Sequence, residues 1–331
     1  MSITINDMSY IKTPKVLEKA KAHFGCQSML GVRLEDQGGT GSAGSHWEAR
    51  YMLGDYMIST DYFENFVSDI TLALFEDSGF YKVDYPKYNP FRFGKDKGCD
   101  FLQKKCIDDK GGVVSPDEFC IKENEPKCSN SRTMKGYCMI GYHSTNIPPQ
   151  YQYFSKPNYG GFTPANYCPV AYERSIKDDY YPTSCKVGNN SSGDYQGDDS
   201  FCFISSLTSG SNTPVDKAMC YKVVCDHNNQ LIKVHVGSQI LICSERKIIQ
   251  HDNFKGNLTC PKYTEICNGF DSNVCNDMFS CLSLGKSNDN YTPHAYKDDE
   301  DDDDEEEIIR ITKSRKLDTF LLLNIILVLL L

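Results

Sequence analysis

The N-terminal part of the chain contains two segments in which apolar residues recur at helical spacing. The first runs from Thr13 to Gly25, with Thr13 as a candidate cap, Pro14 in the first turn and Gly25 just past the end. The second begins at Ser59 and ends at Gly79. Its apolar positions are Phe63, Phe66, Val67, Ile70 and Leu74. This spacing predicts two amphipathic helices, each with one face packed into a core.

The remaining segments read as extended or irregular. Residues 30–36 are predicted to be extended, and the glycine- and serine-rich residues 38–45 to form a loop. Beyond Cys99, apolar runs are short and prolines, tyrosines and glycines are frequent. Three runs there resemble strands joined by the turns HNNQ and GS, namely Tyr221–Val224, Leu231–Val236 and Gln239–Cys243. This part of the chain is therefore predicted to be an irregular domain that contains β-structure.

Cysteine usage sharpens this picture. The chain has sixteen cysteines, and all but Cys26 lie between Cys99 and Cys281. Such a density predicts a disulfide scaffold, which persists in secreted or cell-surface proteins. Zinc binding by thiolates is the less favoured alternative, because the chain has no closely spaced CxxC pair. The pairing does not follow from sequence, although the last four cysteines are close enough to form a compact cluster of their own: Cys260, Cys267, Cys275 and Cys281.

Net charge bears on one class of partner, and glycosylation signals agree with an extracellular setting. The net charge of −10 argues against nucleic acid as a partner, because a phosphate-binding face needs clustered lysine and arginine. Much of that charge comes from the unbroken acidic run Asp298–Glu307, which predicts a solvated stem. Candidate glycosylation sites are Asn189 or Asn190 in NNSS and Asn257 in NLT.

The sequences at the two ends of the chain are relevant to membrane attachment and to secretion. Residues 320–331, FLLLNIILVLLL, would span about 18 Å as a helix, against about 30 Å for a bilayer core. A glycolipid-anchor signal is the favoured interpretation of this tail, and a tail-anchored helix or neither of the two remains open. The first residues, MSITINDMSYIKTPK, lack the apolar core and cleavage site of a secretion signal. We therefore expect that an N-terminal part is missing.

The stretch GGTGSAGSHWEARYMLGDYM carries the most specific chemistry. His46 lies beside Trp47, the only tryptophan, and Met57 follows eleven positions after His46. A zinc protease of the metzincin type brings in its third metal ligand and its methionine turn in this way. Trp47 itself is expected to be a core anchor. The other half of such a site, HExxH, is absent, since none of the seven histidines has another histidine four positions away.

Several blocks in the same order make the chain similar to the leishmanolysin family of surface zinc proteases. The resemblance runs from about Thr13 to Cys281. The blocks are TPKVLEKAKAHFGC, GVRLEDQGG, GSHWEARYMLGDYM, ITLALFEDSGFY, CDFLQKKC, YFSKPNYGGFTPANYCPV and GNLTCPKYTEIC. The resemblance implies an α+β fold in which the C-terminal part of a metzincin catalytic domain, residues 1–97, precedes a disulfide-rich, β-containing domain, residues 98–285. An acidic stem over residues 286–319 and the hydrophobic tail over residues 320–331 would follow.

The resemblance also implies roles for individual residues. His46 matches the third zinc ligand, and Met57 matches the turn methionine, which supports the metal site without coordinating it. The implied cofactor is Zn²⁺, the implied substrates are proteins or peptides, and the implied location is the cell surface, with the membrane reached through the tail or a glycolipid anchor. Since this chain offers one ligand and no general base, we expect it to bind no stoichiometric zinc and to cleave nothing alone.

Two interpretations of the whole chain follow. It is part of an active surface metalloendopeptidase whose HExxH helix lies upstream, or it is a non-catalytic surface protein that serves adhesion or partner binding. The retained His46 and Met57 favour the first. Asp36, Glu48 and Asp55 lie nearby, but carboxylates are common in loops and none is expected to replace the missing base.

Overall fold

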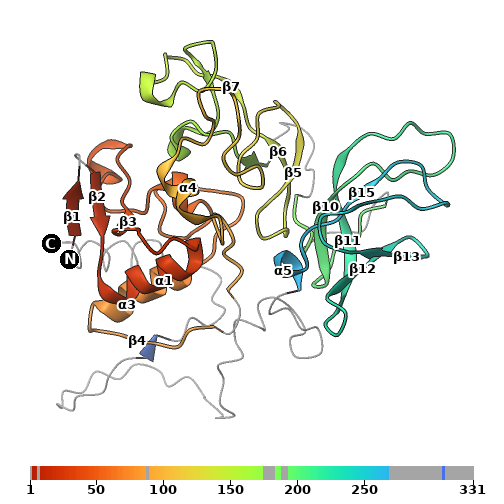
Figure 1. Cartoon of the computed structure of the whole chain (residues 1–331), viewed down its shortest axis with the longest axis horizontal. Coiled ribbons are helices and arrows are strands. Elements are labelled where there is room, and N and C mark those ends of the chain that lie inside the picture. The colour runs from red at the N-terminus through yellow and green to blue at the C-terminus, as the bar shows by residue number, and fades with distance from the viewer. Residues whose placement is uncertain are drawn as a thin grey trace, which may run out of the picture.

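The computed structural model describes residues 2–5, 8–86, 89–173, 183–187, 193–267 and 308–309 (Figure 1). It combines short helices with small antiparallel sheets, as expected for an α+β fold. Several predictions fall outside the described residues and are not addressed by the structure. These are Asn189, Asn190, Cys275, Cys281, the hydrophobic tail and most of the acidic stem.

Helix α1 (Pro14–Phe24) confirms the first predicted helix. Gly25 ends it in the left-handed conformation, with φ 68°, and its N–H bonds to the carbonyl of Lys21. The cap differs from the prediction, because the side chain of Thr13 makes no capping bond. Instead, the carboxylate of Asp77 accepts the N–H groups of Lys15 and Val16, at 2.9 and 3.0 Å. An anion at a helix N-terminus satisfies free N–H groups and complements the helix dipole.

The second predicted helix begins ten residues later than expected. Helix α3 spans Asp69–Asp77, and the side chain of Ser68 caps it by accepting the N–H of Thr71 at 3.1 Å. Residues 59–67 form a loop, because the backbone of Phe66 pairs with that of Gly54 and Tyr56, each at 2.8 Å. The side chains of Phe63 and Phe66 in this loop still pack against the core, which explains why their spacing resembled that of a helix. Helices α1 and α3 lie side by side (Figure 1).

Short elements surround these two helices. Strands β1 (Ser2–Ile5), β2 (Met8–Ile11) and β3 (Val32–Arg33) form an antiparallel sheet in that order. The further short elements are η1 (Gly39–Gly41), α2 (Ala49–Met52), β4 (Lys82–Val83) and α4 (Gly98–Gln103). Strand β4 pairs in parallel with β16 (Ile308–Ile309).

The middle of the chain is irregular, as predicted. It contains a small sheet of β5 (Pro126–Cys128), β6 (Lys135–Cys138) and β9 (Ala171–Tyr172), and a hairpin of β7 (Gly141–Tyr142) with β8 (Tyr159–Gly160). Two 3-10 turns complete it, η2 (Pro149–Tyr151) and η3 (Thr163–Ala165). One hydrophobic cluster runs from Ile11 to Val170 and so includes residues on both sides of residue 97. Its fully buried members include Val16, Phe24, Trp47, Met52, Phe101 and Phe119.

A six-stranded antiparallel sheet forms the C-terminal part, at the right of Figure 1, in the order β13-β12-β11-β10-β15-β14. All three predicted strands are confirmed within it, as β11 (Lys217–Asp226), β12 (Leu231–Val236) and β13 (Gln239–Cys243). The other strands are β10 (Ser200–Ser205), β14 (Ile248–Ile249) and β15 (Leu258–Thr259), and helix α5 (Tyr263–Ile266) follows. Alternate side chains, such as Val223 and Val234, build a second core.

Seven disulfides connect the described cysteines, which confirms the predicted scaffold. The pairs are Cys26–Cys99, Cys106–Cys168, Cys120–Cys138, Cys128–Cys202, Cys185–Cys220, Cys225–Cys267 and Cys243–Cys260. The prediction that the last four cysteines form a cluster of their own is wrong for Cys260 and Cys267, the two that the structure describes. Cys260 and Cys267 are bonded to the six-stranded sheet, because β15 and α5 fold back onto it. Among the described residues, no helix is long and apolar enough to span a bilayer.

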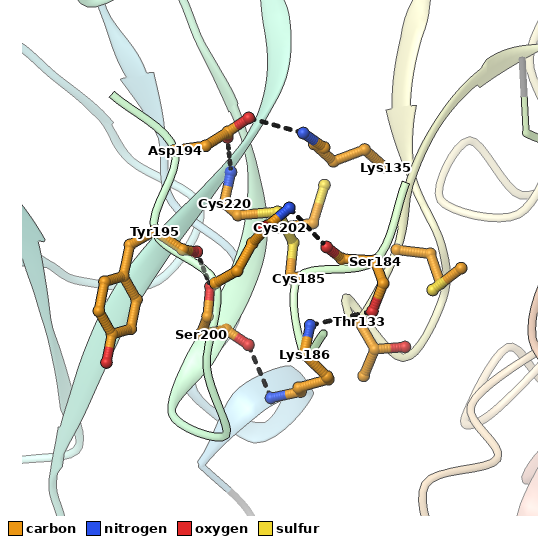
Figure 2. Close-up of a disulfide and its surroundings, with 12 residues drawn as sticks. Thr133, Lys135, Ser184, Cys185, Lys186, Asp194, Tyr195, Ser200, Cys202 and Cys220 are labelled. Carbon is orange, nitrogen blue, oxygen red and sulfur yellow. Dashed lines mark hydrogen bonds and ion pairs between the residues drawn. A yellow bond between two sulfur atoms is a disulfide. The ribbon is translucent and has the colours of Figure 1, made fainter. Parts of the chain in front are cut away.

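A buried ion pair reinforces the join between the middle region and this sheet (Figure 2). Asp194 lies between the Nζ of Lys135 in β6, at 2.6 Å, and the backbone N–H of Cys220 in β11, at 2.7 Å. Both charged side chains are about nine-tenths buried, at 10% and 11% exposed. The Cys185–Cys220 disulfide runs beside them.

Candidate metal centre

The segment that contains His46 is held between two other backbone segments. The N–H of Glu35 donates to the carbonyl of His46 at 2.9 Å, and the N–H of Glu48 donates to Arg33 at 3.0 Å. On the other side, the N–H of Trp47 donates to the carbonyl of Met57 at 3.0 Å. The two residues singled out from sequence are therefore brought together, with a single hydrogen bond joining the neighbour of His46 to Met57.

The imidazole of His46 is half-buried, and one of its two nitrogens is engaged. Nδ1 lies 3.3 Å from the carbonyl oxygen of Ser42 and 3.1 Å from the hydroxyl of Ser45. Since a carbonyl can only accept, the Ser42 contact favours the tautomer with hydrogen on Nδ1. Within the described residues Nε2 makes no hydrogen bond. Metal-binding histidines commonly show this arrangement, with one N–H bonded to a backbone carbonyl and the other nitrogen left for the metal.

A buried network fixes the turn at Met57. Met57 is 2% exposed, and its N–H donates to Asp55 at 2.7 Å. Asp55 is fully buried and also accepts the N–H of Ser68 at 3.1 Å and the hydroxyl of Thr71 at 2.9 Å. The same hydroxyl accepts the indole N–H of Trp47 at 2.8 Å. Burial raises the pKa of Asp55, while these hydrogen bonds oppose that shift.

The prediction that Trp47 anchors the core is confirmed, because its side chain is 0% exposed. Its indole also links the residue after His46 to the first turn of α3 through Thr71. The methionine turn and the helix that follows it therefore form one packed unit.

One group of three carboxylates also lies at this site. Oxygens of Glu35, Asp36 and Glu48 lie within 4.8 Å of one another, the one such cluster among the described residues that could hold a metal ion. However, the guanidinium of Arg33 already pairs with Asp36, and its Nε lies 3.6 Å from Glu48. A bound arginine fills the role of the cation, so we assign this cluster no metal.

Burial dominates the electrostatics of Glu48. Its side chain is fully buried, and burial together with the neighbouring Glu35 raises the pKa of Glu48 to about 8, although Arg33 opposes the shift. Burial also raises the pKa of Glu35. The expectation that none of these carboxylates replaces the missing base stays a prediction.

A complete zinc site does not fit the residues present. Catalytic zinc is held by about three protein ligands and a water molecule. In the described residues the candidate ligand His46 belongs to no group of three possible metal ligands, and the whole sequence has no HExxH. We therefore derive no catalytic step through zinc from this chain.

Sequence reasoning did not anticipate how the site is supported. Asp55 carried a usable signal, because an acidic residue two positions before Met57 can accept its N–H in an Asx turn. Ser68 and Thr71 also have the spacing of a helix cap. Asn166, which contacts Glu48 from more than a hundred residues away, carried no signal at all.

Of the candidate glycosylation sites, the structure describes Asn257. This residue precedes β15 and is half-buried, and its side-chain oxygen accepts a hydrogen bond from Gln250 at 2.9 Å. Thr259, the third residue of the sequon, is exposed.

Known proteins are similar in sequence to this chain. A family model described as leishmanolysin matches residues 4–274. A leishmanolysin homolog from Crithidia fasciculata is 31% identical over 277 residues, which cover 78% of this chain and 41% of that protein. Leishmanolysin from Leishmania donovani is 29% identical over 283 residues, which cover 80% of this chain and 46% of that protein. A leishmanolysin-like peptidase from Drosophila melanogaster is 35% identical over 181 residues, which cover 49% of this chain and 26% of that protein. The chain spans less than half the length of these relatives.

Proposed function

Because the chain belongs to the leishmanolysin family of metallopeptidases, we propose that it is the part of a zinc metalloendopeptidase that contributes the third zinc ligand, His46, and the methionine turn, Met57. In this proposal, residues 1–97 are the C-terminal portion of the protease domain, and residues 98–285 are the cysteine-rich domain.

The arrangement around His46 carries the proposal. The contact between Nδ1 and the Ser42 carbonyl leaves Nε2 available, and the hydrogen bond from Trp47 to Met57 packs the turn beneath the same segment. Both features are expected of a metal ligand that is oriented before the metal arrives.

The 331 residues alone are proposed to be inactive. Zinc binding and peptide hydrolysis would need two further ligands and a general base from polypeptide outside this sequence, because it contains no HExxH. The substrates of the assembled enzyme would be proteins or peptides. The seven disulfides support an extracellular location, and the apolar tail would attach the protein to the cell surface directly or through a glycolipid.

The direct test supplies the HExxH segment that this sequence lacks. The upstream part of the Crithidia homolog is fused to this chain, and hydrolysis of a protein substrate is measured with one equivalent of zinc. We expect cleavage that is lost on His46→Gln and retained on His251→Gln, because His251 lies beside the six-stranded sheet, where its Nδ1 accepts the N–H of Asn253 at 3.3 Å. Retained cleavage in the His46→Gln fusion would contradict the proposal, and resistance of each fusion to trypsin serves as the folding control.

A second candidate function is non-catalytic adhesion or partner binding. The observation that favours it is the absence of HExxH from a chain whose described cysteines are all paired internally. The 5′ end of the native transcript distinguishes the two functions. An upstream in-frame HExxH supports the enzyme, whereas a start at Met1 in a protein that reaches the cell surface supports the binding protein.

A further inference from the structure

The loop that delivers His46 has little intrinsic stiffness. Residues 38–45 are glycine, serine, alanine and threonine, and Gly38, Gly39 and Gly44 all have positive φ angles. Glycine-rich segments lose much conformational entropy when ordered, so contacts from elsewhere must hold such a loop. The contacts at its two ends therefore decide how firmly His46 is oriented.

One side chain from the cysteine-rich part contacts both ends of this loop. The side-chain oxygen of Asn166 accepts a hydrogen bond from the amide of Gln37, at 2.5 Å, just before the loop. The side-chain nitrogen of Asn166 donates to Oε1 of Glu48, at 3.1 Å, just after His46. Asn166 is 3% exposed and Glu48 is fully buried. A single buried amide thus closes the loop by donating to one end and accepting from the other.

The backbone at Asn166 is held in an unusual conformation. Asn166 ends turn η3 in the left-handed region, with φ 55°, and Tyr167 follows with φ 58°. Asparagine tolerates this region better than other non-glycine residues, but two consecutive examples are costly and persist only where the surroundings impose them.

Covalent and hydrogen-bonded contacts impose this conformation. Cys168 is bonded to Cys106, and the backbone of Phe162 pairs with Cys168 and Tyr167, each at 3.0 Å. The ring of Tyr167 packs edge-on against His143, with centroids 5.0 Å apart. Asn166 is therefore presented from a rigid base, as a group that fixes another loop should be.

The bond from Asn166 reaches a residue that also starts a helix. The side-chain nitrogen of Asn166 donates to Oε1 of Glu48, and the same oxygen accepts the N–H of Arg50 at 3.4 Å and so caps α2. Asn166 is therefore connected both to the loop and to the start of the helix that follows it.

From this geometry we infer that Asn166 is a positioning residue for His46: the cysteine-rich part of the chain clamps the loop of residues 38–45 and holds the imidazole of His46 in one tautomer and one orientation. This inference rests on the proposed role of His46 as a metal ligand. It adds that the disulfide-rich part belongs to the ligand-orienting structure of the protease and is not merely appended to it.

The test removes the amide without disturbing the backbone. Asn166→Gly keeps the left-handed conformation, which glycine adopts readily, and deletes both hydrogen bonds. The matched control is Asn158→Gly, which deletes a half-buried amide that bonds to the carbonyl of His143 at 3.2 Å, away from the loop. Gln37→Ala removes the bonds at the loop entrance, to Asn166 and to the carbonyl of Thr163, but keeps the bond from Asn166 to Glu48, and should give an intermediate effect.

Two measurements on the oxidised 331-residue chain report on His46. Histidine-selective ¹⁵N NMR, assigned with His46→Gln, distinguishes hydrogen on Nδ1 from hydrogen on Nε2. We expect one tautomer in the unaltered chain and a mixture in Asn166→Gly. Subtilisin cleavage within residues 38–45 should become about tenfold faster in Asn166→Gly, because the loop opens more often. Asn158→Gly should change neither measurement.

An unchanged His46 spectrum together with a cleavage rate within about twofold of the unaltered chain would overturn the inference. The same holds if Asn158→Gly produces the changes expected of Asn166→Gly. Intact mass and cooperative unfolding verify that each variant folds with its disulfides formed. Neither measurement involves zinc or peptide hydrolysis, so a failure here is distinct from a failure of the proposed protease function.

Discussion

The backbone N–H of Trp47 donates to the carbonyl of Met57 at 3.0 Å. This bond joins the residue after the candidate zinc ligand to the candidate methionine turn, which are ten residues apart in sequence. The indole of Trp47 and the carboxyl of Asp55 both form hydrogen bonds with the hydroxyl of Thr71, so side-chain contacts also fix the turn. The predictions below follow from this unit and from the contacts around it.

Asp55 is predicted to be the most sensitive residue of the turn. Asp55→Ala would leave the buried donors of Met57, Ser68 and Thr71 without their acceptor, so the free energy of unfolding should fall by about 3 kcal/mol or more. Urea unfolding of the oxidised chain measures this. Asp61→Ala, at an exposed position nearby, is the control and should change stability by less than about 0.5 kcal/mol. Equal effects of the two substitutions would contradict this account of the turn.

Glu48 is predicted to make stability fall as the pH rises. Its folded-state pKa of about 8 exceeds its ordinary value of 4.5, so the folded protein binds more protons than the unfolded chain between these two pH values. The contribution of Glu48 is therefore fully present below about pH 4.5 and is lost as the pH rises toward about 8. Thermal unfolding from pH 5 to 8 measures the slope.

Glu48→Gln provides the comparison for that slope. Glutamine is neutral at every pH and keeps an acceptor for Asn166, so the variant should lose less stability than the unaltered chain over the same range. Glu123→Gln, at an exposed position, should leave the slope unchanged. Identical slopes for Glu48→Gln and the unaltered chain would show that Glu48 is ionised throughout.

The ion pair of Asp194 and Lys135 is predicted to stabilise the join between the middle region and the six-stranded sheet. Asp194→Ala removes the acceptor for Lys135 and for the N–H of Cys220, leaving a buried ammonium unpaired (Figure 2). The free energy of unfolding should decrease by about 3–5 kcal/mol. The control is Asp100→Ala, because Asp100 pairs with Lys104 on the surface and should contribute at most about 1 kcal/mol. A loss at Asp194 no larger than that at Asp100 would refute the prediction.

Asn257 is predicted to carry an N-linked glycan when the chain passes through a secretory pathway. The sequon lies at the start of β15, where Thr259 is exposed. Glycopeptide mass spectrometry of the chain, secreted by means of an added signal peptide, should detect the modification, and Asn257→Gln should remove it. Complete absence of the glycan from that site, with the chain secreted and folded, would count against the prediction.

Local patterns were enough to predict the elements whose structure depends on neighbouring residues. The spacing of Val16, Ala20 and Phe24 defined α1, and the alternation along Leu231–Val236 defined β12. The spacing of His46 and Met57, within several ordered blocks, indicated the family that the comparisons support.

Features that depend on contacts between residues far apart in sequence could not be predicted from local patterns. Phe63 and Phe66 have helical spacing, but backbone pairing of Phe66 with the methionine turn keeps them in a loop. Cysteine pairing likewise depends on how β15 and α5 fold back onto the sheet. The contact between Asn166 and Glu48 joins residues 118 positions apart, and no local pattern encodes it.

The central claim is that His46 is one zinc ligand whose partners lie outside these 331 residues. The most direct measurement is the zinc content of the purified, oxidised chain after equilibration with zinc and desalting, determined by elemental analysis. The account predicts far less than one zinc per chain, with no difference between the unaltered chain and His46→Gln, because a single imidazole holds the ion weakly. One tightly bound zinc per chain that disappears on His46→Gln would contradict it, since the chain would then contain a complete site.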